Sequence, residues 1–111
     1  MGEHKQALLK TRLGQRFSEG ARRLWLLLEE RSWRQKDLID NMSATLANRA
    51  TAEQTRPRKI SNGVVCRWLY GERVPDRHYA VFLQEEYAID ASLWGKASEQ
   101  PFIPPAARQA A

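Results

Sequence analysis

Asn62, Val64 and Arg67 lie close together in the stretch ISNGVVCRWLYGERVP, which runs from Ile60 to Pro75. An arginine can donate two hydrogen bonds to O6 and N7 of guanine, and an asparagine can bond to N6 and N7 of adenine. A valine can pack against the methyl group of thymine. If the three side chains share an exposed surface, they could contact the edges of nucleic-acid bases.

The same stretch has the spacing of an amphipathic helix. At about 100° per residue, Val65, Trp68 and Leu69 form a stripe at positions i, i+3 and i+4, which is expected to be buried. The opposite side carries small, polar and basic residues, namely Gly63, Cys66, Arg67 and Tyr70, flanked by Asn62 and Val64. One side of this helix is therefore predicted to be held in a core while the other is free to contact an anionic partner.

Local signals set the bounds of the predicted helix at 61–70. Ser61 is a favourable N-cap residue. Gly71 stands where a left-handed residue commonly ends a helix, and Pro75 prevents the helix from continuing.

The rest of the chain also follows a helical period, which predicts an all-α fold with a compact bundle of about five short helices. The other four are expected at about 18–31, 34–42, 77–87 and 91–97. Their predicted inward residues are Phe17, Ala21, Leu24 and Leu28; Leu38, Ile39 and Met42; Tyr79, Val81, Phe82 and Leu83; and Leu93 and Trp94. Residues 17–98 would form the domain, between a basic N-terminal segment (1–16) with a short helix near Leu8 to Leu13 and an irregular, proline-rich tail (99–111).

Positive charge is concentrated around the stretch that opens this section. The chain of 111 residues has 18 Lys and Arg against 13 Asp and Glu, a net charge of +5. Between Arg56 and Arg77 six basic residues face two acidic ones, so a net +4 lies in this region. This distribution favours a polyanionic partner.

The sequence around this stretch resembles the Xre/Cro-repressor type helix-turn-helix family. ERSWRQKDLI, from Glu30 to Ile39, is similar to the join between the family's first two helices, and ISNGVVCRWLYGERVP is similar to its recognition helix and exit. YAID followed by SLW resembles the end of the fourth helix and the start of the fifth. The resemblance covers about Phe17 to Ala97.

The resemblance implies a repressor-like transcription regulator that binds double-stranded DNA, with the helix begun by Ser61 in the major groove. Gln35 would bond a phosphate from the start of the second helix. Base edges would be contacted from the recognition helix, by Asn62, Gly63, Val64 and Arg67. Tyr70 and Arg73 would touch the DNA backbone.

The chain departs from this family between the second and third helices, where the family has a tight turn around a glycine. Here the segment 43–59, SATLANRATAEQTRPRK, intervenes. Its first part keeps a helical spacing and could lengthen the second helix, whereas TAEQTRPRK is predicted to be a loop because Pro57 discourages helix at the preceding residue. Since the segment is basic, we expect it to contact a phosphate strand or the minor groove, with Arg58 and Lys59 nearest the recognition helix.

Other functions find little support in the sequence. There is no glycine-rich phosphate loop, nucleophile elbow or convergent acidic cluster, so we expect neither an enzyme nor a cofactor. His4 and His78 are isolated, which argues against a metal site. A lone Cys66, with no signal peptide and no span of ~20 apolar residues, leads us to expect a cytoplasmic, nucleoid-associated protein with no membrane contact.

A second protein surface is predicted from the run LWLLL, Leu24 to Leu28, which is apolar around more than one helix face. Repressors of this type often bind palindromic sites as two-fold dimers, so a homodimer is expected. The alternative is a protein-interaction or antitoxin-like module on the same fold, with this run and the PFIPP tail as its working surface.

Overall fold

The computed structural model describes residues 17–98, which form a mostly helical domain of four α-helices and one short 3-10 helix. The elements are α1 Glu19–Arg31, α2 Gln35–Glu53, α3 Asn62–Leu69, α4 Arg77–Tyr87 and the 3-10 helix η2 Ala91–Gly95. This part of the chain has no strand, only a single antiparallel bridge between Ser18 and Ala97. The predicted helical fold is confirmed here, although the fifth element is a 3-10 helix shorter than the predicted 91–97. The predictions for 1–16 and 99–111 lie outside the described residues.

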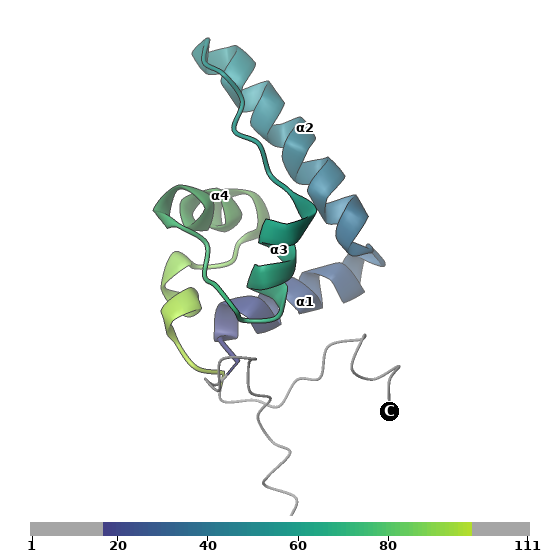
Figure 1. Ribbon diagram of the computed structural model, residues 1–111, viewed down its shortest axis with the longest axis vertical. Coiled ribbons are helices and arrows are strands. Elements are labelled where there is room, and N and C mark those ends of the chain that lie inside the picture. Colours follow the sequence, from purple (N-terminus) through teal and green to yellow (C-terminus); the bar gives the residue numbers. More distant parts are fainter. Residues whose placement is uncertain (1–16, 99–111) are drawn as a thin grey trace, which may run out of the picture.

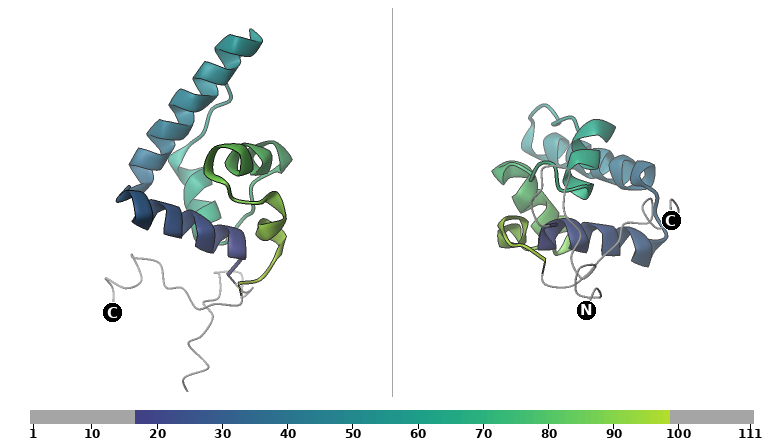
Figure 2. Two further views of the ribbon diagram at one scale, coloured as in Figure 1. Left: turned by 180° about the vertical axis from the view of Figure 1, so that it is seen from behind. Right: turned by 60° about the horizontal axis from the view of Figure 1, so that its bottom comes forward.

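The helices surround α3 on three sides. In Figures 1 and 2, α3 lies between α2 and α4, and it packs against both α1 and α2. The 3-10 helix η2 brings the chain back to the N-terminal end of α1, where the amide of Ser98 donates to the carbonyl of Phe17 at 2.7 Å. α3 is therefore fixed by its neighbours rather than by its own length, since eight residues alone make a marginal helix.

Short polar side chains fix where the helices begin. In α1, α3 and α4 the N-cap oxygen accepts a hydrogen bond from the backbone N–H three residues further on, at 3.1 Å for Ser18, 3.3 Å for Ser61 and 3.0 Å for Asp76. Each bond satisfies one of the N–H groups that a helix leaves unpaired. Gly71 follows α3 with a φ of 73°, the left-handed conformation predicted for it. The predicted limits of α3 and α4 are thus confirmed to within a residue.

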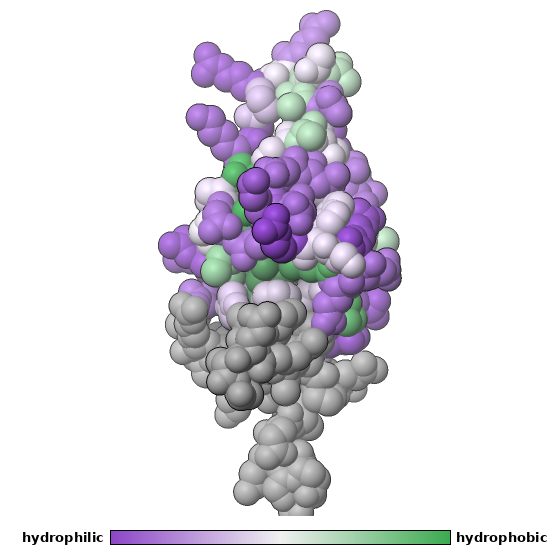
Figure 3. Space-filling model, turned by 90° about the vertical axis from the view of Figure 1, so that its right-hand side faces the viewer, coloured by the Kyte–Doolittle hydropathy of each residue, from purple (hydrophilic) through white to green (hydrophobic). Residues whose placement is uncertain are grey.

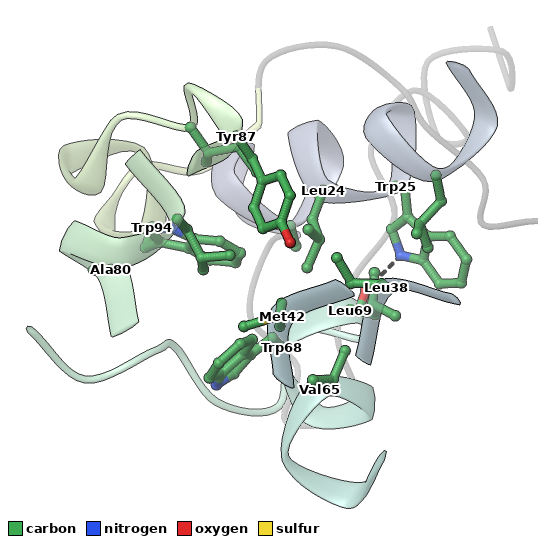
Figure 4. Packing of buried hydrophobic residues seen from close by; sticks show 14 of the residues in the cluster. Leu24, Trp25, Leu38, Met42, Val65, Trp68, Leu69, Ala80, Tyr87 and Trp94 are labelled. Carbon is green, nitrogen blue, oxygen red and sulfur yellow. Dashed lines mark hydrogen bonds between the residues drawn. The ribbon is translucent and has the colours of Figure 1, made fainter. Parts of the chain in front are cut away.

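One hydrophobic core holds the helices together (Figure 4). All the residues predicted inward on α1 are buried, as are Val65, Trp68 and Leu69 on α3. The prediction for Val81 was wrong, because its side chain is 42% exposed. The buried stripe of α4 instead follows Ala80, Leu83 and Tyr87, which recur at the period of a helix, and Val81 lies off that stripe.

Two tryptophans set the spacing between elements. The indole Nε1 of Trp25 in α1 donates to the carbonyl oxygen of Leu69 at 2.6 Å, satisfying one of the last carbonyl groups of α3 (Figure 4). Trp94 in η2 lies against Gly20, where an added Cβ would come within 2.4 Å of the indole ring. Gly20 is thus needed for close packing of η2 on α1.

The inserted segment lengthens α2, which projects beyond the body of the domain (Figure 1). The helix continues to Glu53, so the prediction of a loop from Thr51 onward was wrong for its first residues. Burial of Leu46 and Ala50 continues the inward face of α2 and stabilises these extra turns. The helix ends at Gln54, whose φ is 57°.

The outer side of α2 offers little apolar surface. Figure 3 shows it as mostly hydrophilic, with pale green areas along the projecting end. The exposed apolar residues of this end are small ones, Ala44, Ala47 and Ala52. We therefore regard this side as a solvated surface.

Candidate nucleic-acid interface

The exposed side of α3 carries the residues that the sequence singled out. Ser61, Asn62, Gly63 and Arg67 are exposed, while Val64 is half-buried and packs partly against the core. A Cβ added to Gly63 would meet no atom within 4 Å, so the backbone is open to solvent here. The buried stripe anchors the other side of the helix. A partner could therefore approach the first turn of α3 and Arg67 together.

Gln35, at the start of α2, contacts the first residue of α3 directly. Its Nε2 donates to the carbonyl oxygen of Asn62 at 3.0 Å and to the Asn62 Oδ1 at 2.6 Å. The bond from Gln35 engages Oδ1 and leaves the Nδ2 group of the exposed Asn62 as a donor for a partner. Bidentate bonding to adenine needs both atoms, so Asn62 is better placed to donate to an acceptor on a base or a phosphate.

The basic loop before α3 is tied to α4. The hydroxyl of Tyr79 donates to the carbonyl oxygen of Lys59 at 2.7 Å. The Arg58 guanidinium lies 5.7 Å from the centre of the Tyr79 ring and 4.0 Å from the Asp76 carboxylate. These contacts hold the backbone next to Ser61 while the side chains of Arg58 and Lys59 stay exposed.

Arg49, the first arginine of the inserted segment, pairs with carboxylates of α4. Its guanidinium pairs with Glu85 at 2.8 Å and with Glu86 at 2.5 Å, and it lies 4.8 Å from the centre of the Phe82 ring. The hydrogen bond that Arg49 donates to the Glu86 carboxylate is the main cause that raises the pKa of Arg49. Arg49 therefore fastens α2 to α4, and its charge does not add to the loop.

Tyr70 and Arg73 follow α3 and differ in exposure. Tyr70 is half-buried, with its ring edge-on to Trp25 at 5.6 Å between centroids. Arg73 is exposed, and its amide donates to the carbonyl of Arg67 at 3.3 Å. The turn is therefore folded against the end of α3, which brings Arg73 beside Arg67.

The structure gathers the predicted residues into one surface, which we call the α3 face. It comprises the exposed side of α3 with the loop before it and the turn after it, namely Arg58, Lys59, Ser61, Asn62, Gly63, Val64, Arg67 and Arg73. Gln35 adjoins it through Asn62. Sequence reasoning missed Tyr79 as the residue that fastens the loop, because its spacing identified it only as a core residue.

Other kinds of site find no counterpart in residues 17–98. No group of three or more His, Cys, Asp or Glu side chains there could hold a metal ion. None of the helices in this range is both long enough and apolar enough to cross a membrane.

Comparisons of the chain with protein-family models, curated proteins and solved structures find no match. The interpretation of the α3 face therefore depends on its own geometry and charge.

Proposed function

We propose that the protein is a sequence-specific, double-stranded DNA-binding regulator of transcription. α2 and α3 would act as a helix-turn-helix of the Xre/Cro-repressor type, with a long connection in place of the tight turn. The observation that carries this proposal is the α3 face, where Asn62 and Arg67 stand exposed on a rigidly held helix. A helix with one exposed, polar and basic side fits the major groove of DNA better than the deep, narrow groove of RNA.

The residues of the α3 face would contact two parts of the duplex, the bases and the phosphates. Arg67 would read a guanine through its two donors, and Asn62 would donate to a base or a phosphate. Arg58, Lys59 and Arg73 would contact phosphates, which fixes the register of the protein on the duplex without reading sequence. The Tyr79 bond supports this division because it orders the loop before DNA arrives.

Selection from a random duplex pool, followed by fluorescence-anisotropy titration, tests the proposal. The selected duplex should bind ~10³-fold or more tightly than a scrambled duplex of the same length. Arg58→Ala should weaken binding to both duplexes about equally. It should also reduce the dependence of affinity on salt concentration by the amount expected for about one phosphate contact. Equal binding of both duplexes would exclude sequence reading, and a lack of binding by the folded protein would exclude double-stranded DNA as its partner.

A protein partner is a second proposal, supported by α1. Leu24, Trp25 and Leu28 of the LWLLL run are buried, but Leu26 and Leu27 are only half-buried. Leu27 still packs against the core cluster, whereas Leu26 does not belong to it within the described residues. We propose Leu26 as part of a homodimer contact, or of the surface for another protein in an antitoxin-like module.

Sedimentation of the protein against its Leu26→Ser variant tests this second role. A dimer that dissociates in the variant supports the contact, and a monomer in both contradicts a homodimer.

A further inference from the structure

A hollow of about 240 Å³ lies between α3 and the turn that leads into α4. Its lining surface is mostly apolar, and Val64, Trp68, Val74 and Tyr79 supply the apolar side chains. Trp68 and the half-buried Tyr79 form its inner part, with ring centroids 5.5 Å apart. The hollow is therefore preformed by side chains that the core holds in place.

Val74 is an exposed part of this lining. It is the most exposed large apolar side chain of the described residues, at 57%. A single exposed valine needs no explanation in itself. Here, however, it joins an apolar recess that opens beside the proposed base-reading residues of α3.

Charged residues surround the recess and limit what can enter it. The exposed residues that complete its lining are Arg67, Arg73 and Asp76. The two arginines favour a polyanion nearby. The carboxylate of Asp76, whose partner Arg58 lies 4.0 Å away, disfavours a phosphate inside. The recess thus suits an uncharged apolar group carried by an anionic polymer.

We infer that this hollow receives the 5-methyl group of a thymine in the bound duplex, with Val74 as a specificity-determining residue. The inference depends on the proposed function and adds a base contact to it. In the major groove the thymine methyl is the apolar group that base edges present. With Arg67 on a neighbouring base and Arg73 on a phosphate, a thymine beside them would place its methyl between Val64 and Val74.

Replacing each thymine of the selected duplex in turn by deoxyuridine tests this contact, since only the methyl is removed. Replacement at the thymine that fills the hollow should lower the affinity about fourfold. This factor corresponds to ~0.8 kcal/mol for one buried carbon, at 1.4 kcal/mol per tenfold change. Val74→Ala should lose affinity for the thymine duplex and become insensitive to deoxyuridine at that position. Val81→Ala, which shortens the other exposed valine, 42% exposed and on α4, should keep the full sensitivity.

A cytosine and a 5-methylcytosine at the same position separate the methyl from the rest of the base. The methylated base should recover part of the affinity in the wild type and none in Val74→Ala. The protein could bind the selected duplex selectively and yet show no deoxyuridine effect, or an effect that Val74→Ala leaves intact. Either result would overturn the hollow as a methyl site and leave the proposed function standing. If no duplex is bound selectively by the folded protein, the proposed function itself fails.

Discussion

Replacing Tyr79 by phenylalanine should loosen the basic loop without disturbing the core. The change removes only the hydroxyl that donates to the Lys59 carbonyl at 2.7 Å, and it keeps the ring that packs against Trp68. A neutral hydrogen bond of this kind contributes ~1 kcal/mol net, which corresponds to a fall in Tm of ~4–8 °C for a small domain. The loop would also lose its anchor, so the backbone around Lys59 would have to be ordered on binding, at ~1–2 kcal/mol for each residue.

Urea unfolding and amide hydrogen exchange of residues 54–61 measure the two effects separately. Tyr87→Phe is the matched control, because it removes a hydroxyl that donates to Asn41 Oδ1 at 2.6 Å between α4 and α2 and not to the loop. Both variants should lose stability to a similar extent, but only Tyr79→Phe should speed exchange in the loop. Unchanged loop exchange in Tyr79→Phe would refute the reasoning that this bond orders the basic loop before α3.

Further predictions concern two glycines and one carboxylate. Gly20→Ala should destabilise the fold by ~1–3 kcal/mol because its Cβ would overlap the Trp94 ring, as urea unfolding would measure. Gly63→Ala should raise stability by ~0.5–1 kcal/mol, since the position is open. Under the proposed function it should also weaken DNA binding, because the duplex would approach the backbone there, and stronger binding by this variant would contradict that approach. The Arg22 side chain hydrogen-bonds Glu19 and lowers the pKa of Glu19 from 4.5 to about 2. Because this pKa is lowered in the folded state, the interaction stabilises the fold above pH 4.5, and this stabilisation is lost as the pH falls towards 2. The free energy of unfolding of Glu19→Gln, measured as a function of pH, should therefore fall less over this range than that of the wild type.

The faces and ends of the helices were largely predictable where local signals suffice. The stripe of Val65, Trp68 and Leu69 identified the buried side of α3, and Ser61 and Gly71 marked its limits. The other helices end differently, since Ser32, Gln54 and Ala88 adopt left-handed conformations with no glycine to signal them. Residues of these types rarely take a positive φ, so local propensity cannot locate such ends.

The candidate site was predictable as a set of residues but not as a set of contacts. Residue types and charge identified Arg67 and the basic loop. The bond from Gln35 to Asn62 joins residues 27 positions apart, and the pairing of Arg49 with Glu85 spans 36. Such contacts depend on how α2 lies against α3 and α4, which a helical period does not specify.

The central claim is that α3 reads bases, and one comparison of two arginine variants tests it directly. Arg67→Ala and Arg23→Ala remove the same charge, but Arg23 lies on α1 beside Glu19. In anisotropy titrations Arg67→Ala should reduce the margin between the selected and scrambled duplexes by ~1–3 kcal/mol, and Arg23→Ala should leave that margin unchanged. If both variants lose the same small amount of affinity for the selected and the scrambled duplex, the claim is contradicted. The α3 face would then be a basic surface that binds DNA without reading its sequence.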